Sequence, residues 1–74
     1  MSERIRSLTA QEVEDILRRH GFALVSQRGS HRKWRSASLR MIVIVPFHAG
    51  RVLPRGTLRA IMTAAEIPES EWRS

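Results

Sequence analysis

The chain has 74 residues, no cysteine and a formal net charge of +6. A chain this short buries only about 60% of the surface of its unfolded form, so we expect one domain over residues 1–74, with a thin core and residues 1–8 loosely ordered. The lack of cysteine excludes a disulfide framework and a thiolate metal site. No apolar run approaches the roughly 20 residues that cross a bilayer, and residues 1–8 lack the apolar core of a secretion signal. We therefore expect a cytoplasmic protein without a membrane partner.

The charge is carried almost entirely by arginine, and it is unevenly distributed. Thirteen Lys and Arg residues are present against seven Asp and Glu, and residues 28–59 contain no acid. The guanidinium group matches phosphate oxygens in a two-pronged geometry. The segregation therefore predicts a positive face and a polyanionic partner. The plain alternative is a basic surface that serves only solubility.

The first predicted element is a helix in "LTAQEVEDILRRHG", with signals at both ends. Thr9 is the expected N-cap, Glu12 has the capping-box spacing, and Leu8 can pack on Val13 as a hydrophobic staple. Gly21 supplies a left-handed stop. One face of the helix consists of Val13, Ile16 and Leu17. His20 either extends this face or belongs to the favourable cationic end of the helix.

Three strands are predicted next. Residues 22–28, "FALVSQR", and residues 31–36, "HRKWRS", form a hairpin around a Gly-Ser turn, with Trp34 the only large apolar side chain of the second strand. Residues 39–46, "LRMIVIVP", form the third strand, which Pro46 ends because proline cannot donate to a sheet ladder.

A loop, "FHAGRVLPRG", leads to a second helix. We expect Thr57 to cap this helix and Pro68 to stop it, and Trp72 to fold back onto the core. The apolar face of the helix consists of Leu58, Ile61, Met62 and Ala65. The predicted fold is therefore α+β, in the order α-β-β-β-α, with both helices on one face of a three-stranded antiparallel sheet.

The other face of this sheet is where we expect the function. Because strand side chains alternate, burial of Trp34 places Arg32 on the covered side and turns His31, Lys33 and Arg35 to solvent. A histidine can act as general base or acid near neutral pH, and RNA carries its own nucleophile, the 2'-hydroxyl. Cations that stabilise the charge developing on phosphorus would allow cleavage without a metal. His31 is thus the candidate catalytic residue, and an ordinary exposed histidine after a turn is the alternative.

Several neighbours of His31 can bind RNA. Gly29 allows close backbone approach, Ser30 offers a hydroxyl, and the cations can contact phosphates. The candidate RNA-binding residues are Arg28, Gly29, Ser30, Arg32, Lys33 and Arg35. His48, in the loop after the third strand, is a second candidate acid or base, although a loop histidine is more often simply exposed. We expect no metal and no cofactor, because two imidazoles without a nearby carboxylate make a poor zinc site.

Four motifs occur in order along the chain: "HGF" at the end of the first helix, "RGSHRKW", "VIVPFH" and "PRGTLRAIM". Together they resemble the HicA (YcfA-like) toxins of bacterial type II toxin-antitoxin systems, over nearly everything from Thr9 to Trp72. The resemblance implies a fold similar to the double-stranded RNA-binding domain, mRNA interferase activity, and His31 at the position of the catalytic histidine. It also implies a cognate HicB-type antitoxin that covers the active face. The toxin itself would then contact DNA only indirectly, through this antitoxin. The resemblance assigns no role to His48, and Trp34 stands where Phe or Tyr is more usual.

Three hypotheses follow from these residues. The leading one is a metal-independent endoribonuclease toxin that uses His31. The second is a non-catalytic RNA-binding module of the same fold, which needs the cations but not the imidazole. The third is an interaction protein whose positive face serves only an acidic partner chain, and it predicts no RNA affinity even at low salt.

Overall fold

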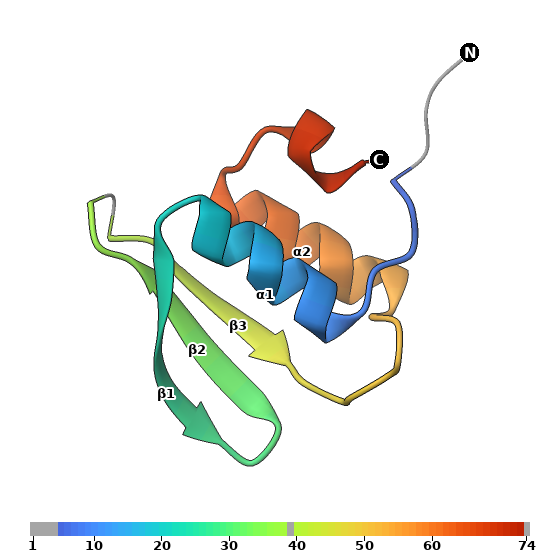
Figure 1. The fold of residues 1–74 in the computed structure, drawn as a ribbon, viewed down its shortest axis with the longest axis horizontal. Coiled ribbons are helices and arrows are strands. Elements are labelled where there is room, and N and C mark those ends of the chain that lie inside the picture. Colours follow the sequence, from blue (N-terminus) through green and yellow to red (C-terminus); the bar gives the residue numbers. More distant parts are fainter. Residues whose placement is uncertain (1–4, 39, 74) are drawn as a thin grey trace.

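The computed structural model describes residues 5–38 and 40–73. Its elements are α1 (Ala10–Arg19), β1 (Phe22–Arg28), β2 (His31–Ser36), β3 (Ile42–Pro46), α2 (Arg55–Ala65) and a short 3-10 helix, η1 (Glu69–Trp72). The strands form one antiparallel sheet in the order β1-β2-β3. Both α-helices lie on one side of the sheet, and η1 folds over them (Figure 1). This arrangement confirms the predicted α-β-β-β-α fold.

Helix α1 has the ends that its sequence predicts. The Thr9 hydroxyl accepts a hydrogen bond from the backbone N–H of Glu12 (3.2 Å), and the Glu12 carboxylate accepts one from the backbone N–H of Thr9 (2.9 Å), so both halves of the capping box are formed. The bond from the Thr9 backbone is the largest cause that lowers the pKa of the Glu12 carboxyl group. Gly21 follows the helix with a φ of +87°, which glycine adopts without strain.

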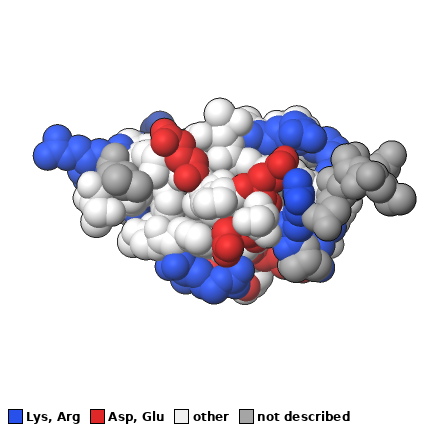
Figure 2. Space-filling view, turned by 90° about the horizontal axis from the view of Figure 1, so that it is seen from above, with Lys and Arg blue, Asp and Glu red and all other residues white. Residues whose placement is uncertain are grey.

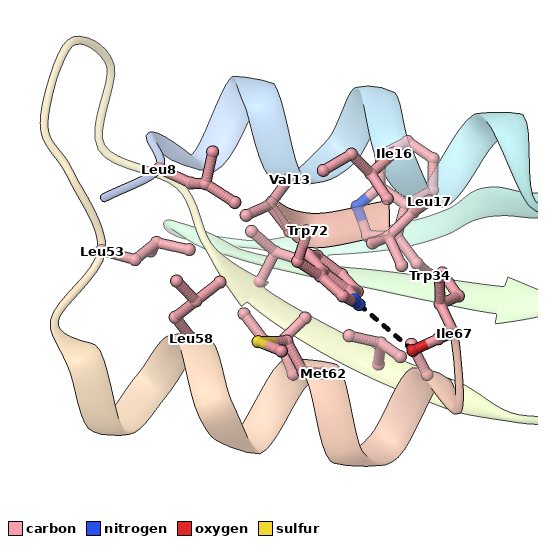
Figure 3. Packing of buried hydrophobic residues seen from close by; sticks show 14 of the residues in the cluster. Leu8, Val13, Ile16, Leu17, Trp34, Leu53, Leu58, Met62, Ile67 and Trp72 are labelled. Atoms are coloured by element: carbon pink, nitrogen blue, oxygen red, sulfur yellow. Dashed lines mark hydrogen bonds between the residues drawn. The ribbon is translucent and has the colours of Figure 1, made fainter. Parts of the chain in front are cut away.

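The core lies between the covered face of the sheet and the helices. Trp34, Val43 and Val45 contribute from the sheet, and all three are buried. The apolar faces of α1 and α2 pack against them (Figure 3). Trp72 of η1 is 1% exposed, and its indole Nε1 donates to the carbonyl oxygen of Ile67 (3.3 Å), so the chain end folds back as predicted.

The beginning of the described chain also contributes to the core. Ile5 and Leu8 are 4% and 2% exposed, so both side chains are part of the core. Residues 1–4 lie outside the described residues. Leu8 and Val13 are members of the same buried cluster, in agreement with the predicted hydrophobic staple.

The third strand is shorter than predicted. It begins at Ile42 rather than at residue 39, because Arg40 has a left-handed backbone with a φ of +59° and belongs to the β2–β3 connection. The Arg40 N–H donates to the carbonyl oxygen of Ser36 (2.9 Å), which closes this turn. Residue 39 itself lies outside the described part of the chain.

The prediction that Thr57 caps the second helix was wrong. Helix α2 begins at Arg55 with Pro54 as the N-cap residue, and Thr57 lies inside the first turn. Proline has a fixed φ, here −57°, that leads directly into a helix. The helix ends at Ala65, before Pro68, because Glu66 adopts a left-handed conformation (φ 53°); Pro68 is instead the residue before η1.

Candidate active site

The side of the sheet that the helices leave uncovered is called the open face below. Residues directly opposite each other on neighbouring strands project to the same side, so the strand pairing arranges this face in three rows. The rows are Arg28–His31–Pro46, Ser26–Lys33–Ile44 and Ala23–Arg35–Ile42. In β2, His31, Lys33 and Arg35 are exposed while Trp34 and Ser36 are buried, which is the alternation predicted from Trp34.

His31 is the first residue of β2, and the backbone around it is held on both sides. Gly29 makes the preceding turn with a φ of +58°, where a side chain would be strained. The Gln27 side-chain amide donates to the Gly29 carbonyl oxygen (3.0 Å), and the Phe47 N–H donates to the Ser30 carbonyl oxygen (2.6 Å). The His31 ring is therefore exposed on a backbone whose position is fixed.

The cations of the open face are not neutralised by acids. The chain contains no Asp or Glu between residues 16 and 65, which includes every residue of the sheet. Arg28, Lys33 and Arg35 are exposed, and none of them takes part in an ion pair with another described residue. The positive potential over His31 therefore persists at the surface.

The acids among the described residues belong to α1, to η1 and to the residue after α2, so the exposed ones lie on the helical side of the molecule. Figure 2 looks from above onto the side where η1 lies, and Asp and Glu side chains are interspersed there with Lys and Arg. Exposed pairs on this side include Asp15 with Arg18 (3.1 Å) and His20 with Glu71 (3.2 Å). His20 is thus a second imidazole of the chain in a quite different setting, with a carboxylate partner.

Arg32 differs from the other predicted RNA-binding residues. Its Nε donates to Glu14 Oε2 (2.7 Å), with 19% and 3% of the two side chains exposed, and its Nη1 donates to Gln27 Oε1 (3.1 Å). Its guanidinium group also lies over the Phe47 ring, 4.9 Å from the ring centre. The structure therefore places Arg32 on the covered side, at the border of the core.

Glu14 is the important residue that the sequence analysis did not single out. Its carboxylate is buried in α1 and accepts from Arg32 Nε and from the indole Nε1 of Trp34 (2.9 Å). The available signal was an acid within the apolar stripe of a helix, since a buried carboxylate requires a cation or N–H partner. Glu14 thereby joins α1 to the strand that carries His31.

His48 lies beyond the end of β3, in the loop before α2. It is exposed and lines a pocket of about 330 Å³ together with Arg51 and Pro46. Within residues 5–38 and 40–73, no group of three or more His, Cys, Asp or Glu side chains lies close enough to hold a metal ion. None of the helices in these ranges is both long and apolar enough to cross a membrane.

The fold and the open face define a class of small, basic α+β domains that leave one cationic side of a three-stranded sheet uncovered. Comparison with known families matches residues 10–67 to the HicA toxins of bacterial toxin-antitoxin systems. Since the match covers most of the chain, the protein belongs to the HicA toxin family, and its partner is of the antitoxin kind. A search of curated proteins finds no match.

Proposed function

We propose that this toxin is a metal-independent endoribonuclease that cleaves mRNA in the cytoplasm, with His31 as its general base. The observation that carries the proposal is the position of His31, which is exposed in the first row of the open face between Arg28 and Pro46. A base must reach the proton that it removes. An imidazole on an uncovered, acid-free sheet can be approached by a ribose and its phosphate.

The reaction uses the nucleophile that RNA supplies. The neutral imidazole of His31 takes the proton of a 2'-hydroxyl, and the 2'-oxygen attacks the adjacent phosphorus. The bond between phosphorus and the 5'-oxygen breaks, and that oxygen takes up a proton from water or from a second acid. The products are a 2',3'-cyclic phosphate and a 5'-hydroxyl, and His31 returns its proton to water.

The open-face cations bind the RNA backbone in this proposal. Side chains on one face of a strand repeat about every 7 Å. Lys33 and Arg35 therefore follow His31 at this spacing along the open side of β2. Arg28 lies beside His31 across the strand pair. Their charges attract the phosphates and stabilise the charge that develops during attack. Gly29 and Ser30 let the sugar-phosphate chain approach the turn closely.

Arg32 has a different part. Because its guanidinium group is already bonded to Glu14 and Gln27, it is a poor candidate for direct phosphate contact. It supports the site by fixing β2 against α1. We therefore assign Arg32 a positioning role, next to the residue that does the chemistry.

The same face suits an antitoxin. Ile42 and Ile44 are 50% and 44% exposed and lie opposite Arg35 and Lys33. Apolar and cationic groups alternate across this surface, which fits a partner with acidic and apolar side chains. A cognate HicB-type antitoxin that covers these residues would exclude RNA from His31.

The test is an RNA cleavage assay with the toxin purified free of antitoxin, in the presence of EDTA. We expect the unmodified protein to cut and His31→Ala to bind the RNA with an affinity within about threefold but to cut 10² to 10⁴ times more slowly, the usual contribution of a general base. His20→Ala, which removes an exposed imidazole on the other side, is the matched control and should cut normally. Cleavage by His31→Ala at the normal rate contradicts the proposal, and RNA binding without cleavage by the unmodified toxin favours the non-catalytic binding module.

A further inference from the structure

A pocket is lined by residues from the end of β3, from the loop that follows it and from the first turn of α2. Figure 1 shows the course of this loop from β3 to α2. Its volume of about 330 Å³ is at the lower end of the roughly 300–1,000 Å³ of small-molecule sites. It can therefore take one planar group rather than an extended ligand. The residues that matter here are Pro46, His48, Arg51, Val52 and Thr57.

The pocket begins where the first row of the open face ends. Pro46 lines the pocket and is also the sheet partner of His31. Directly opposed residues of antiparallel strands have Cα atoms only about 4.5–5.5 Å apart. The pocket and His31 are therefore joined through Pro46, which makes it possible for one nucleotide to contact both.

The loop around the pocket is held in place at three points. The Phe47 N–H donates to the Ser30 carbonyl oxygen next to His31 (2.6 Å). The Arg51 N–H donates to the His48 carbonyl oxygen (3.1 Å), in a turn where Gly50 has a φ of +77°.

The third point joins the loop to the residues just before α1. The Leu53 N–H donates to the Leu8 carbonyl oxygen (2.8 Å), and Val52 pairs with Thr9 as an isolated bridge. The pocket is thus preformed, which lowers the entropy lost on binding.

The side chains of the pocket suit a nucleobase. Unstacked RNA bases are bound by stacking on aromatic rings, including histidine, and by hydrogen bonds to their edges. His48 supplies a ring, Arg51 supplies guanidinium donors, and Thr57 supplies a hydroxyl that can donate or accept. Val52, which is 57% exposed, adds an apolar contact. Because Arg51 only donates, a base edge with two acceptors, such as that of guanine, matches it best.

We infer that this pocket binds one base of the RNA next to the scissile phosphate, with His48 stacked on the base and Arg51 bonded to its edge. The inference rests on the proposed ribonuclease activity and adds the origin of its sequence preference. It also gives His48 a role in recognition rather than in proton transfer.

The first test compares cleavage of four RNAs that differ in one nucleotide at the cut site. We expect the unmodified toxin to cut them at rates that differ by about tenfold or more, as one well-read base allows. In His48→Ala and in Arg51→Ala the rates should converge to within about threefold, whereas Arg59→Ala, an exposed cation of α2 outside the pocket, should keep the differences. Equal rates with the unmodified toxin, or a preference that survives both substitutions, would overturn the inference. An equal loss of rate on all four RNAs in His48→Ala would assign His48 to proton transfer and overturn its part in recognition.

The second test needs no cleavage. Nucleoside 5'-monophosphates are titrated into His31→Ala, and backbone amide shifts are followed by NMR. We expect shifts at His48, Arg51 and Thr57 that depend on the base, and much smaller ones with ribose 5-phosphate. Identical responses to ribose 5-phosphate and to all four nucleotides would overturn the inference. Base-dependent shifts together with an unmodified toxin that never cuts RNA would refute the ribonuclease proposal and leave the pocket as a base-binding site.

Discussion

The two faces of strand β2 use charge in different ways. On the covered face, Arg32 lies at the border of the core, bonded to the buried carboxylate of Glu14. On the open face, Lys33 and Arg35 are exposed, and the sheet contains no acid. Charge on the covered face holds α1 to the sheet, whereas charge on the open face adds little to the fold and is available to a ligand. Substitutions on the two faces should therefore affect different measurements.

The largest expected effect on stability is that of Glu14→Ala. The change leaves Arg32 Nε and the Trp34 indole N–H without their shared acceptor, so the free energy of unfolding should fall by about 2–4 kcal/mol. Glu14→Gln keeps an acceptor and should lose less. Denaturant unfolding measures both variants. A Glu14→Ala variant with normal stability but without RNA affinity would contradict the assignment of stability to the covered face and of RNA binding to the open face.

The reverse pattern is expected for the double variant Lys33→Ala, Arg35→Ala. Because these side chains are exposed, each change should alter the free energy of unfolding by no more than about 0.5 kcal/mol. Affinity for single-stranded RNA should fall, and the slope of log affinity against log salt should decrease by about 1.4, since each phosphate contact contributes about 0.7. Arg19→Ala with Arg59→Ala removes two exposed cations outside the sheet and is the control. An unchanged slope in the double variant of β2 would mean that this face does not hold the RNA.

A smaller effect is expected at the N-cap of α1, which lies on the helical side of the sheet (Figure 1). Thr9→Ala removes the acceptor of the Glu12 backbone N–H and should lower the free energy of unfolding by about 1 kcal/mol. Thermal unfolding measures this loss. RNA cleavage by the folded protein should be unchanged, and a variant that unfolds normally but cuts slowly would contradict this expectation.

The smallest effect concerns pH. The pKa of the Glu12 carboxyl group is lowered in the folded protein, chiefly by the Thr9 backbone N–H. The ionised carboxylate therefore contributes its full share of the free energy of unfolding above the ordinary carboxyl pKa of about 4.3. This contribution is lost as pH falls through the lowered folded value. The stability difference between the unmodified protein and Glu12→Gln should therefore be greatest near neutral pH and shrink in acid. A stability difference that grew as pH fell would mean that folding raises the pKa of Glu12, which contradicts this prediction.

Local signals were enough to predict much of the fold. Thr9, Glu12 and Gly21 mark the ends of α1, and the bounds of β1 and β2 agree with the prediction. The exposure of His31 followed from a single apolar side chain, Trp34, because strand residues alternate. The bounds of β3 and α2 were less accurate because a left-handed arginine and the fixed φ of Pro54 gave no clear local pattern.

The remaining features depend on contacts between distant parts of the chain. The Glu14–Arg32 pair joins residues 18 positions apart. The apolar stripe of α1 indicates that Glu14 is buried, but it does not indicate which cation pairs with it. The pocket exists because the loop after β3 is bonded to Ser30 and Leu8. Arg32 was predicted to bind RNA although the alternation of strand side chains put it on the side of Trp34. Its bond to Glu14, which occupies the guanidinium group, is a long-range contact that the sequence does not reveal.

The most direct test of the central claim, that an open-face imidazole activates the 2'-hydroxyl of RNA, is to identify the ends of the products made in EDTA. We predict 2',3'-cyclic phosphate and 5'-hydroxyl ends, and no cut at a position where the ribose is replaced by 2'-deoxyribose. Products with 3'-hydroxyl and 5'-phosphate ends, or cleavage at the deoxyribose position, would show that water attacks instead and would contradict the account.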